Sequence, residues 1–373
     1  DSIIFTANDQ STHWYSLNFA DDSDDNSILD YCVIEYGSES GYDPYYGMIN
    51  TNNSNPTISN NRISNGTSDG ITLINSNSLI SNNLITSING DAIEGDENSA
   101  PTISYNTFDD INTRGIYLIN GSNATINENT FTSIENDCIY LESHDLTTIY
   151  SNTISVIDGT GIYLNNSSYV YIGNNSISNT SEYGIYLQQN CDYASIGSNS
   201  IENGSSYGIY IYYNNDDVDI ISNTISGNGS MGIYFQEDNH RVKIEGNEIN
   251  NNSYGVYFDS NYHNELIIND NLIYNNNNTG LHLNYINGTI SNNVIADNSS
   301  YGIYIRPIYG SVQIINNTID GNGNYGLYYN QYSNNSVEVI NNSVTNNNTG
   351  LYSSNDAYIT INNNNSWNNN GSN

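Results

Sequence analysis

The chain has 373 residues, with 40 Asp and Glu against 5 Lys and Arg, which gives a formal net charge of -35. Such a charge repels phosphate backbones and anionic lipid headgroups, so nucleic acid and membrane surfaces are disfavoured as partners. Apolar residues still make up 36% of the chain and 35 residues are Tyr, which is too much for a disordered polyanion. No apolar run reaches the roughly 18 residues of a membrane span, so membrane insertion is not expected.

Residues 1–30 precede the regular part of the sequence, and we predict that they form an N-terminal cap or an incomplete first coil. The chain opens on Asp1, with neither Met nor a leader sequence, which is typical of a processed, exported protein. The stretch "DDSDDN" collects carboxylates that suit calcium but lacks the ligand spacing of a dedicated loop. We therefore expect at most a weak calcium site at Asp21, Asp22, Asp24 and Asp25. No other cofactor is expected for the protein.

Residues 31–366 form one long repeat. Gly followed by an alternating apolar–Tyr–apolar stretch recurs every 22 to 25 residues, and Ala92 and Cys138 fill two gaps in the series. Self-similarity at this period indicates a solenoid. The Gly positions are Gly47, Gly70, Gly115, Gly161, Gly184, Gly208, Gly232, Gly255, Gly280, Gly302, Gly326 and Gly350.

Each repeat reads as short strands joined by Asn-, Ser- and Gly-rich turns, without an apolar stripe at helical spacing. We therefore predict an all-β, single-stranded parallel β-helix of about 14 to 15 coils, with a polar C-terminal tail at 367–373. Ile185 and Leu187 should point inward and Tyr186 outward. A second motif, Ile-x-x-Asn-x-Ile, predicts a ladder of stacked amides. Its Asn positions are Asn61, Asn83, Asn106, Asn129, Asn152, Asn175, Asn199, Asn223, Asn247, Asn271, Asn293, Asn317, Asn342 and Asn364.

Turns such as "ISNNRI" from Ile58 and "ISNNLI" from Ile80 give the chain a family resemblance. It resembles the right-handed parallel β-helix proteins: pectate-lyase-like enzymes, mannuronan epimerases, nitrous-oxide-reductase maturation proteins, and archaeal and bacterial surface proteins. The resemblance covers roughly residues 28–366 and implies the right-handed fold. These relatives perform unrelated chemistry on one scaffold, so the resemblance does not specify a function.

The sequence gives only weak evidence for catalytic residues. "GYDPYYG" resembles the Tyr-Gly-x-Asp-Pro-His motif of the epimerases through Asp43 and Pro44, but Tyr45 stands where His belongs. The few basic residues could scarcely hold an acidic polymer. A glycosidase would need a pair of carboxylates, but we interpret the candidate carboxylates as solvated turn residues and expect no catalytic residue. The candidate carboxylates are Asp109 with Asp110, Asp216 with Asp217, and the group Asp91, Glu94, Asp96 and Glu97.

Cysteine and histidine give no metal or disulfide pattern. Cys138 and Cys191 are about two coils apart, roughly 10 Å of rise, which is too far for a disulfide. We expect Cys32, Cys138 and Cys191 to be buried thiols, although bridging between chains stays open. The histidines have no common ligand spacing. They are His13, His144, His240, His263 and His282.

Several Asn-x-Ser/Thr sequons lie in the turn just before the repeated Gly, where we expect the Asn side chain to face solvent. Glycosylation is therefore expected at some of these sites. The candidates are Asn65, Asn120, Asn203, Asn228, Asn287 and Asn298.

Tyrosines two residues after the repeated Gly predict an aromatic stripe. Stacking of the rings on one another would explain it, and so would a face for self-association or glycan contact. The residues are Tyr117, Tyr140, Tyr163, Tyr186, Tyr210, Tyr234, Tyr257, Tyr304, Tyr328 and Tyr352.

From this pattern we expect a non-catalytic structural or adhesive protein of the cell surface, assembling with itself into a sheath, surface layer or filament. The alternative is a carbohydrate-binding or carbohydrate-active β-helix protein, and a weaker one is a metal-maturation protein. An enzyme should place carboxylates and a base at one spot across adjacent coils, which discriminates the first two hypotheses.

Overall fold

The computed structural model describes residues 3–9, 13–21, 23–38, 46–259, 265–307, 310–330, 335–354 and 356–371. The chain forms two compact units, unit 1 (Asp1–Glu182) and unit 2 (Tyr183–Asn373). Within the described residues, the elements are short strands, apart from one 3₁₀ helix, η1 (Asp356–Tyr358). No helix in these ranges is long and apolar enough to cross a membrane.

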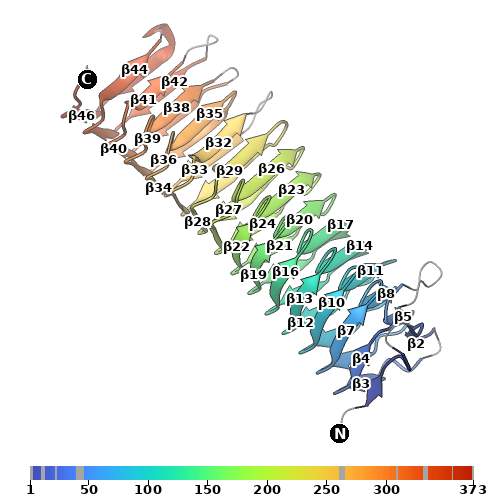
Figure 1. The fold of residues 1–373 in the computed structure, drawn as a ribbon. Coiled ribbons are helices and arrows are strands. Elements are labelled where there is room, and N and C mark those ends of the chain that lie inside the picture. Colours follow the sequence, from blue (N-terminus) through green and yellow to red (C-terminus); the bar gives the residue numbers. More distant parts are fainter. Residues whose placement is uncertain are drawn as a thin grey trace. The chain divides into compact units, whose positions relative to one another are not determined.

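In unit 1, every turn of the chain adds one strand to each of three parallel sheets, which we call A, B and C (Figure 1). Sheet A of unit 1 contains, in order, β1 (Ile4–Phe5), β4 (Val33–Glu35), β7 (Arg62–Gly66), β10 (Leu84–Ile88), β13 (Thr107–Ile111), β16 (Thr130–Ile134), β19 (Thr153–Ile157) and β22 (Ser176–Thr180). Sheet B contains β2 (Leu17–Phe19), β5 (Ile49–Asn52), β8 (Ile71–Ile74), β11 (Ile93–Asp96), β14 (Ile116–Ser122), β17 (Ile139–Asp145) and β20 (Ile162–Asn165). Sheet C contains β3 (Ile28–Asp30), β6 (Thr57–Ser59), β9 (Leu79–Ser81), β12 (Thr102–Ser104), β15 (Thr125–Asn127), β18 (Thr148–Tyr150) and β21 (Tyr171–Gly173).

Unit 2 repeats the same three-sheet plan. Its sheet A contains β25 (Ser200–Glu202), β28 (Thr224–Ser226), β31 (Glu248–Asn250), β34 (Leu272–Tyr274), β37 (Val294–Ala296), β40 (Thr318–Asp320), β43 (Ser343–Thr345) and β46 (Asn365–Trp367). Sheet B contains β23 (Ile185–Gln189), β26 (Ile209–Tyr213), β29 (Met231–Gln236), β32 (Tyr254–Asp259), β35 (Leu281–Asn284), β38 (Ile303–Arg306), β41 (Tyr325–Tyr329) and β44 (Thr349–Ser353). Sheet C contains β24 (Ser195–Gly197), β27 (Asp219–Ile221), β30 (Lys243–Glu245), β33 (Glu265–Asn269), β36 (Asn287–Ser291), β39 (Val312–Ile315), β42 (Val337–Ile340) and β45 (Ile359–Asn362).

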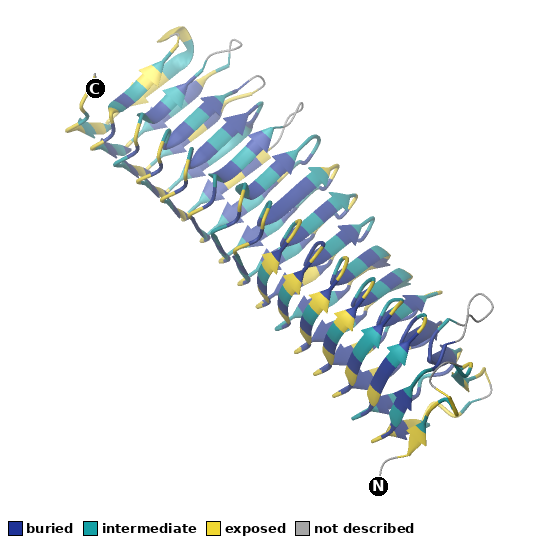
Figure 2. Ribbon diagram, viewed as in Figure 1, coloured by how far each residue is buried: buried dark blue, intermediate teal, exposed yellow. Residues whose placement is uncertain are grey.

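The core is a set of apolar columns, because equivalent residues of successive turns pair in register. Ile116 pairs with Ile139, and Ile139 with Ile162, and all three are fully buried. Figure 2 shows the resulting alternation of buried and partly exposed residues along the strands. The predicted all-β parallel solenoid is confirmed. One predicted repeat position is wrong: Ile49 pairs with Ile71, so Met48, and not Gly47, occupies the place of Gly70.

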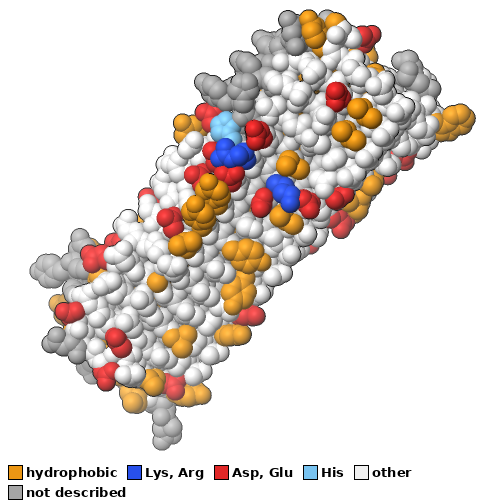
Figure 3. All heavy atoms as spheres, turned by 180° about the vertical axis from the view of Figure 1, so that it is seen from behind, with side chains coloured by type: hydrophobic (Ala, Val, Ile, Leu, Met, Phe, Trp, Pro, Cys, Tyr) orange, Lys and Arg blue, Asp and Glu red, His pale blue; other side chains and the backbone are white. Residues whose placement is uncertain are grey.

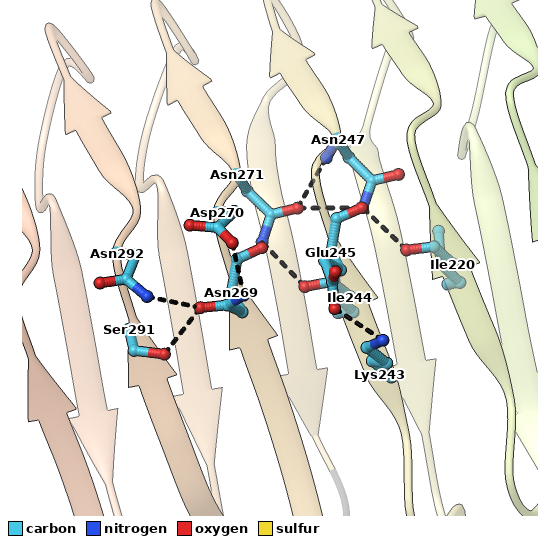
Figure 4. Close-up of polar contacts among 10 residues, drawn as sticks. All are labelled: Ile220, Lys243, Ile244, Glu245, Asn247, Asn269, Asp270, Asn271, Ser291 and Asn292. Carbon is cyan, nitrogen blue, oxygen red and sulfur yellow. Dashed lines mark hydrogen bonds and ion pairs between the residues drawn. The ribbon is translucent and has the colours of Figure 1, made fainter.

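The predicted Asn ladder is confirmed within both units, at the corner between sheets C and A. Asn247 donates from its backbone N and from Nδ2 to Oδ1 of Asn271, both at 2.9 Å, and Nδ2 also reaches the carbonyl of Ile220 at 2.8 Å (Figure 4). Asn271 repeats the pattern toward Asn293. Each amide therefore satisfies the backbone of neighbouring turns while being almost completely buried.

Unit 2 contains a second ladder that the sequence did not reveal, at the corner between sheets A and B. Asn252 donates from Nδ2 to Oδ1 of Asn276 at 3.3 Å and accepts the backbone N–H of Asn228 at 3.0 Å. Its members are Asn228, Asn252, Asn276, Asn298, Asn322, Asn347 and Asn369. Asn228 and Asn298 are 3% and 1% exposed, so the expectation that these two sequons face solvent is wrong. Asn120 and Asn203 are exposed, and Asn65 and Asn287 are partly exposed.

The Tyr stripe forms ring stacks within each unit. In unit 1, Tyr140 stacks on Tyr163 with centroids 4.4 Å apart, and Tyr117 meets Tyr140 edge-on at 5.2 Å. In unit 2, His282 takes a Tyr position and stacks at 4.4 Å on both Tyr257 and Tyr304. Stacked rings cover one another's faces, so the stripe presents mainly ring edges and hydroxyl groups to solvent.

Cys32, Cys138 and Cys191 are buried and form no disulfide, which confirms the expectation of buried thiols. At the N-terminus, residues 4–30 supply one strand to each sheet of unit 1, β1, β2 and β3, and each of these pairs with the next turn.

Candidate active site

A row of charged residues lies in unit 1 directly before the strands of sheet B. Asp69, Asp91, Arg114 and Asp137 each precede the first residue of the repeated Gly–apolar–Tyr stretch. The carboxylates fix the next turn: Asp69 Oδ1 accepts the backbone N–H of Asp91 at 2.8 Å, and Asp91 Oδ1 accepts that of Arg114 at 2.9 Å. Asp137 does the same for Thr160 at 2.9 Å. The row is therefore held by the backbone itself.

Glu94 joins this row from the outward face of β11, in register between Thr72 and Tyr117. Asp69, Asp91 and Glu94 each offer a carboxylate oxygen, and these oxygens lie within 4.8 Å of one another. Asp69 is 7% exposed and the side chain of Asp91 12% exposed, while Glu94 is more accessible. Three carboxyl groups thus converge, and the outermost is Glu94.

Arg114 is the cation of the site. Its Nη1 lies 3.6 Å from Asp91 Oδ2, and its guanidinium lies 3.9 Å from the ring centroid of Tyr117 and 5.0 Å from that of Tyr140. The Tyr117 hydroxyl donates to Glu142 Oε2 at 3.3 Å. Arg114 is therefore held between a carboxylate and two aromatic rings.

The environment keeps a proton on this cluster. Burial raises the pKa of Glu94 to about 8, reinforced by its hydrogen bond to Asp69 and by the charges of Asp69 and Asp91, against the opposing effect of Arg114. Burial also raises the pKa of Asp69 and of Asp137. Like charges this close cannot all be ionised. The raised pKa therefore favours a proton on Glu94 near neutral pH, with carboxylate oxygens of Asp69 and Asp91 within 4.8 Å.

Two buried polar atoms beside Glu94 have no hydrogen-bond partner. Thr72, 4% exposed, is the neighbour of Glu94 on the outward row, and its Oγ1 makes no hydrogen bond. Arg114 Nη1 is also buried without an acceptor at hydrogen-bonding distance. A buried donor without an acceptor costs folding free energy, and such donors are typical of places where a ligand supplies the missing partner.

The three carboxylates could also hold a cation, which would share the site with the positive charge of Arg114. Among the described residues, no other group of three potential ligands converges. Asp24 Oδ1 accepts from the backbone of Asn26, and Asp25 Oδ1 from that of Asn55. Asp21 is exposed, and Asp22 lies outside the described residues. Calcium at this stretch stays a prediction.

The other predicted carboxylates do not form such a site. Asp96 Oδ1 accepts from the backbone of Glu97, and Asp109 from Thr132. Asp216 and Asp217 both bind Arg241, at 3.1 and 2.7 Å. On the face drawn in Figure 3, the basic side chains lie next to acidic ones. The motif around Asp43, Pro44 and Tyr45 lies outside the described residues.

Comparison with known proteins gives the family. The model of the right-handed β-helix region matches residues 4–154, 137–286 and 273–373. The chain belongs to the right-handed β-helix family. No curated protein matches its sequence.

Among solved structures, the A-module of the Azotobacter vinelandii mannuronan C-5 epimerase AlgE4 is 14% identical with a TM-score of 0.50, over 90% of each chain. The AlgE6 A-module is 12% identical with a TM-score of 0.49, over 92% of this chain and 91% of that one. A GH87 α-1,3-glucanase of Streptomyces thermodiastaticus is 12% identical with a TM-score of 0.45, over 84% of this chain and 63% of that one. At such identities the likeness shows the fold alone.

The expectation of a non-catalytic structural subunit is corrected by these findings. The AlgE4 A-module, with which this chain shares the fold, is by its name a mannuronan C-5 epimerase and fits the alternative hypothesis better. The sequence-based view that no carboxylates converge is also wrong, because Asp69, Asp91 and Glu94 meet across successive turns. The physical reason is that carboxylates 22 residues apart in sequence become neighbours when one turn stacks on the next.

Proposed function

We propose that the protein is a carbohydrate-active enzyme that hydrolyses glycosidic bonds, with Glu94 as the general acid. The observation that carries the proposal is the convergence of three carboxyl groups within 4.8 Å, of which Glu94 is the most accessible and has a pKa raised by burial. A carboxyl group that stays protonated near neutral pH is what protonation of a leaving-group oxygen requires.

In the proposed reaction, Glu94 donates its proton to the glycosidic oxygen as the bond from that oxygen to the anomeric carbon breaks. Water adds its hydroxide to the anomeric carbon, and its remaining proton reloads the Asp69–Glu94 pair. Asp91 and Arg114 hold the cluster in place through their 3.6 Å ion pair. Thr72 Oγ1 and Arg114 Nη1, which are buried without a hydrogen bond, would bond sugar hydroxyl groups once the substrate enters beside them.

The test is release of reducing ends from a panel of neutral, amino and acidic polysaccharides, with Glu94→Gln as the key variant. General-acid catalysis is worth about 10²- to 10⁴-fold, so Glu94→Gln should lose that much of kcat while the protein stays folded. The matched control is Glu338→Gln in unit 2, which removes a carboxylate that bonds Gln313 and should leave activity unchanged. Absence of turnover on every polymer, or full activity of Glu94→Gln, would overturn the proposal.

We also infer a location outside the cytoplasm, where polymeric glycans are met. It is supported by the strongly acidic composition and by exposed sequons at Asn120 and Asn203. We expect any glycans at these two and at the partly exposed Asn65 and Asn287, whereas the buried ladder amides of Asn228 and Asn298 should stay unmodified. Peptide mass mapping of native material before and after deglycosylation tests this assignment.

A further inference from the structure

We propose that the substrate is a cationic glycan, a polymer of amino sugars with free amino groups, bound along the corner between sheets A and B of unit 1. This inference rests on the proposed function and names the substrate of that same site. It also separates the protein from enzymes that act on polyuronates, whose negative charge the site would repel.

The charge around Glu94 is the first argument. Asp69, Asp91 and Asp137 form the row beside it, and Glu142 lies against the Tyr117 hydroxyl. Unit 1 contains only two Lys or Arg residues in its sequence, Arg62 and Arg114. Arg114 is already engaged by Asp91, so an incoming sugar meets a net negative surface even when Glu94 is protonated. An ammonium group is attracted to such a surface and a carboxylate is repelled.

Two adjoining hollows extend this surface. One of about 420 Å³ is lined by Asn89, Asp110 and Asn112 among others, and a second of about 220 Å³ shares Asp110 and adds Glu135 and Asp158. The acidic and basic side chains that line them are these three carboxylates and His13, with no Lys or Arg.

The hollows are lined by residues of the same turns that carry the carboxyl cluster. Asn89 and Asn112 are two residues before Asp91 and Arg114 on the same turns, and Asn112 Nδ2 donates to Asn89 Oδ1 at 3.0 Å. Amide groups at this edge suit sugar hydroxyl groups, and the carboxylates suit ammonium groups. A glycan of several sugar units that follows these turns from the hollows toward β11 would reach Glu94.

The unfilled polar atoms at Glu94 point independently to a ligand. Thr72 Oγ1 and Arg114 Nη1 are buried without hydrogen-bond partners, one a hydroxyl group and the other an N–H donor. A metal ion could be ligated by the Thr72 hydroxyl oxygen but would repel the Arg114 guanidinium, whereas a sugar hydroxyl group bonds both. The occupant indicated is thus a hydroxyl-rich molecule that also carries positive charge.

The first experiment compares matched oligosaccharides: a glucosamine hexamer, its N-acetylated counterpart and a galacturonate hexamer. The amino form should show about tenfold higher kcat/KM than the N-acetylated form at low salt, and this advantage should shrink at high salt because screening removes it. The galacturonate form should not be cleaved. If the N-acetylated form is cleaved equally well, the cationic preference is wrong while the proposed hydrolysis stands.

The second experiment removes groove charge without touching the acid. Asp110→Asn should raise KM for the amino hexamer several-fold and leave KM for the N-acetylated hexamer unchanged. Asn tolerates the left-handed backbone at this position, where φ is 59°. The matched control is Asp297→Asn in unit 2, an exposed residue at the same place in the repeat with φ 52°. Equal effects of the two variants, or none from either, would contradict the groove assignment, and inactivity on every hexamer would count against the proposed function instead.

Discussion

The corner between sheets A and B is built differently in the two units. In unit 1, the residue five positions after the ladder Asn is mostly Ile, and Ile88, Ile111 and Ile134 pair in one buried column. In unit 2, the same position is Gly204 in the first turn and Asn from Asn228 onward, and the second ladder runs through these Asn residues. An apolar column and a hydrogen-bonded amide column thus support the same turn-to-turn spacing.

The rows outside this corner differ as well. Before the strands of sheet B, unit 1 places Asp69, Asp91, Arg114 and Asp137, whereas unit 2 places mainly tyrosines such as Tyr183 and Tyr207, which stack at 5.4 Å. The repeat is therefore a scaffold, and the candidate chemistry lies where unit 1 departs from the tyrosine pattern. The comparison teaches that candidate sites in such a protein are best sought at breaks in the repeat.

The largest effect on stability is expected from putting the corner of unit 2 into unit 1. Ile111→Asn should destabilise the protein by about 4 kcal/mol, because a fully buried apolar side chain is lost and its replacement has no amide neighbour above or below. Chemical denaturation measures this. Ile111→Val is the control and should cost only about 1 kcal/mol. A similar cost for both would mean that the column is not close-packed.

The reverse exchange sharpens the comparison. Asn252→Ile should cost about 2 kcal/mol, since the amides of Asn228 and Asn276 lose a buried partner while apolar burial is gained. Asn277→Ile makes the same chemical change at an exposed neighbour and should lie within about 0.5 kcal/mol of wild type. An unchanged midpoint for Asn252→Ile would argue against a stabilising second ladder.

The carboxyl cluster predicts a pH dependence of stability that unit 2 lacks. The folded-state pKa of Glu94 is raised from 4.5 to about 8, so its favourable contribution is complete below about pH 4.5 and is lost as pH rises through about 8. The melting temperature of wild type should therefore fall by a few degrees between pH 6 and pH 9. Glu94→Gln should show a smaller fall, and parallel curves for the two proteins would refute the assignment.

The smallest effect is expected in the aromatic stack of unit 2. Burial lowers the pKa of His282 to about 4, so the stability that neutral His282 contributes is present above about pH 6.5 and is lost as pH falls through 4. His282→Tyr should restore the tyrosine pattern and stabilise the protein below pH 5 by about 1 kcal/mol or less, with little change at pH 7. Thermal melts at the two pH values give the answer, and equal effects at both would exclude a titrating His282.

Much of the fold could be predicted from the sequence, because the repeated Gly, as at Gly208 and Gly232, returns at a nearly constant spacing. This spacing lets each turn pair with the next. At Gly208 the reason is visible: a Cβ would lie 2.6 Å from the carbonyl oxygen of Gly232. The second ladder was missed because Asn228 and Asn298 also read as sequons in a chain full of Asn. Its signal was their constant offset of five residues from the first ladder.

The site was predicted only in fragments. Asp91 and Glu94 were noticed as part of an acidic run with Asp96 and Glu97, yet their partners Asp69 and Arg114 lie one turn away on either side. Aligning the repeats in columns would have brought Asp69, Asp91, Arg114 and Asp137 together. The raised pKa of Glu94 depends on burial and on hydrogen-bond geometry, which an alignment of the repeats does not give.

The in-register pairing of turns has a consequence for how this protein can change over generations. Each strand bonds only the equivalent strand of the preceding and following turn, as Ile233 does with Ile209 and Val256. An in-frame duplication or loss of one repeat of about 24 residues in unit 2 would therefore present matching strands and matching amides at both junctions. Recombination between similar repeats could lengthen or shorten this unit in single steps while the carboxyl cluster of unit 1 kept its neighbours.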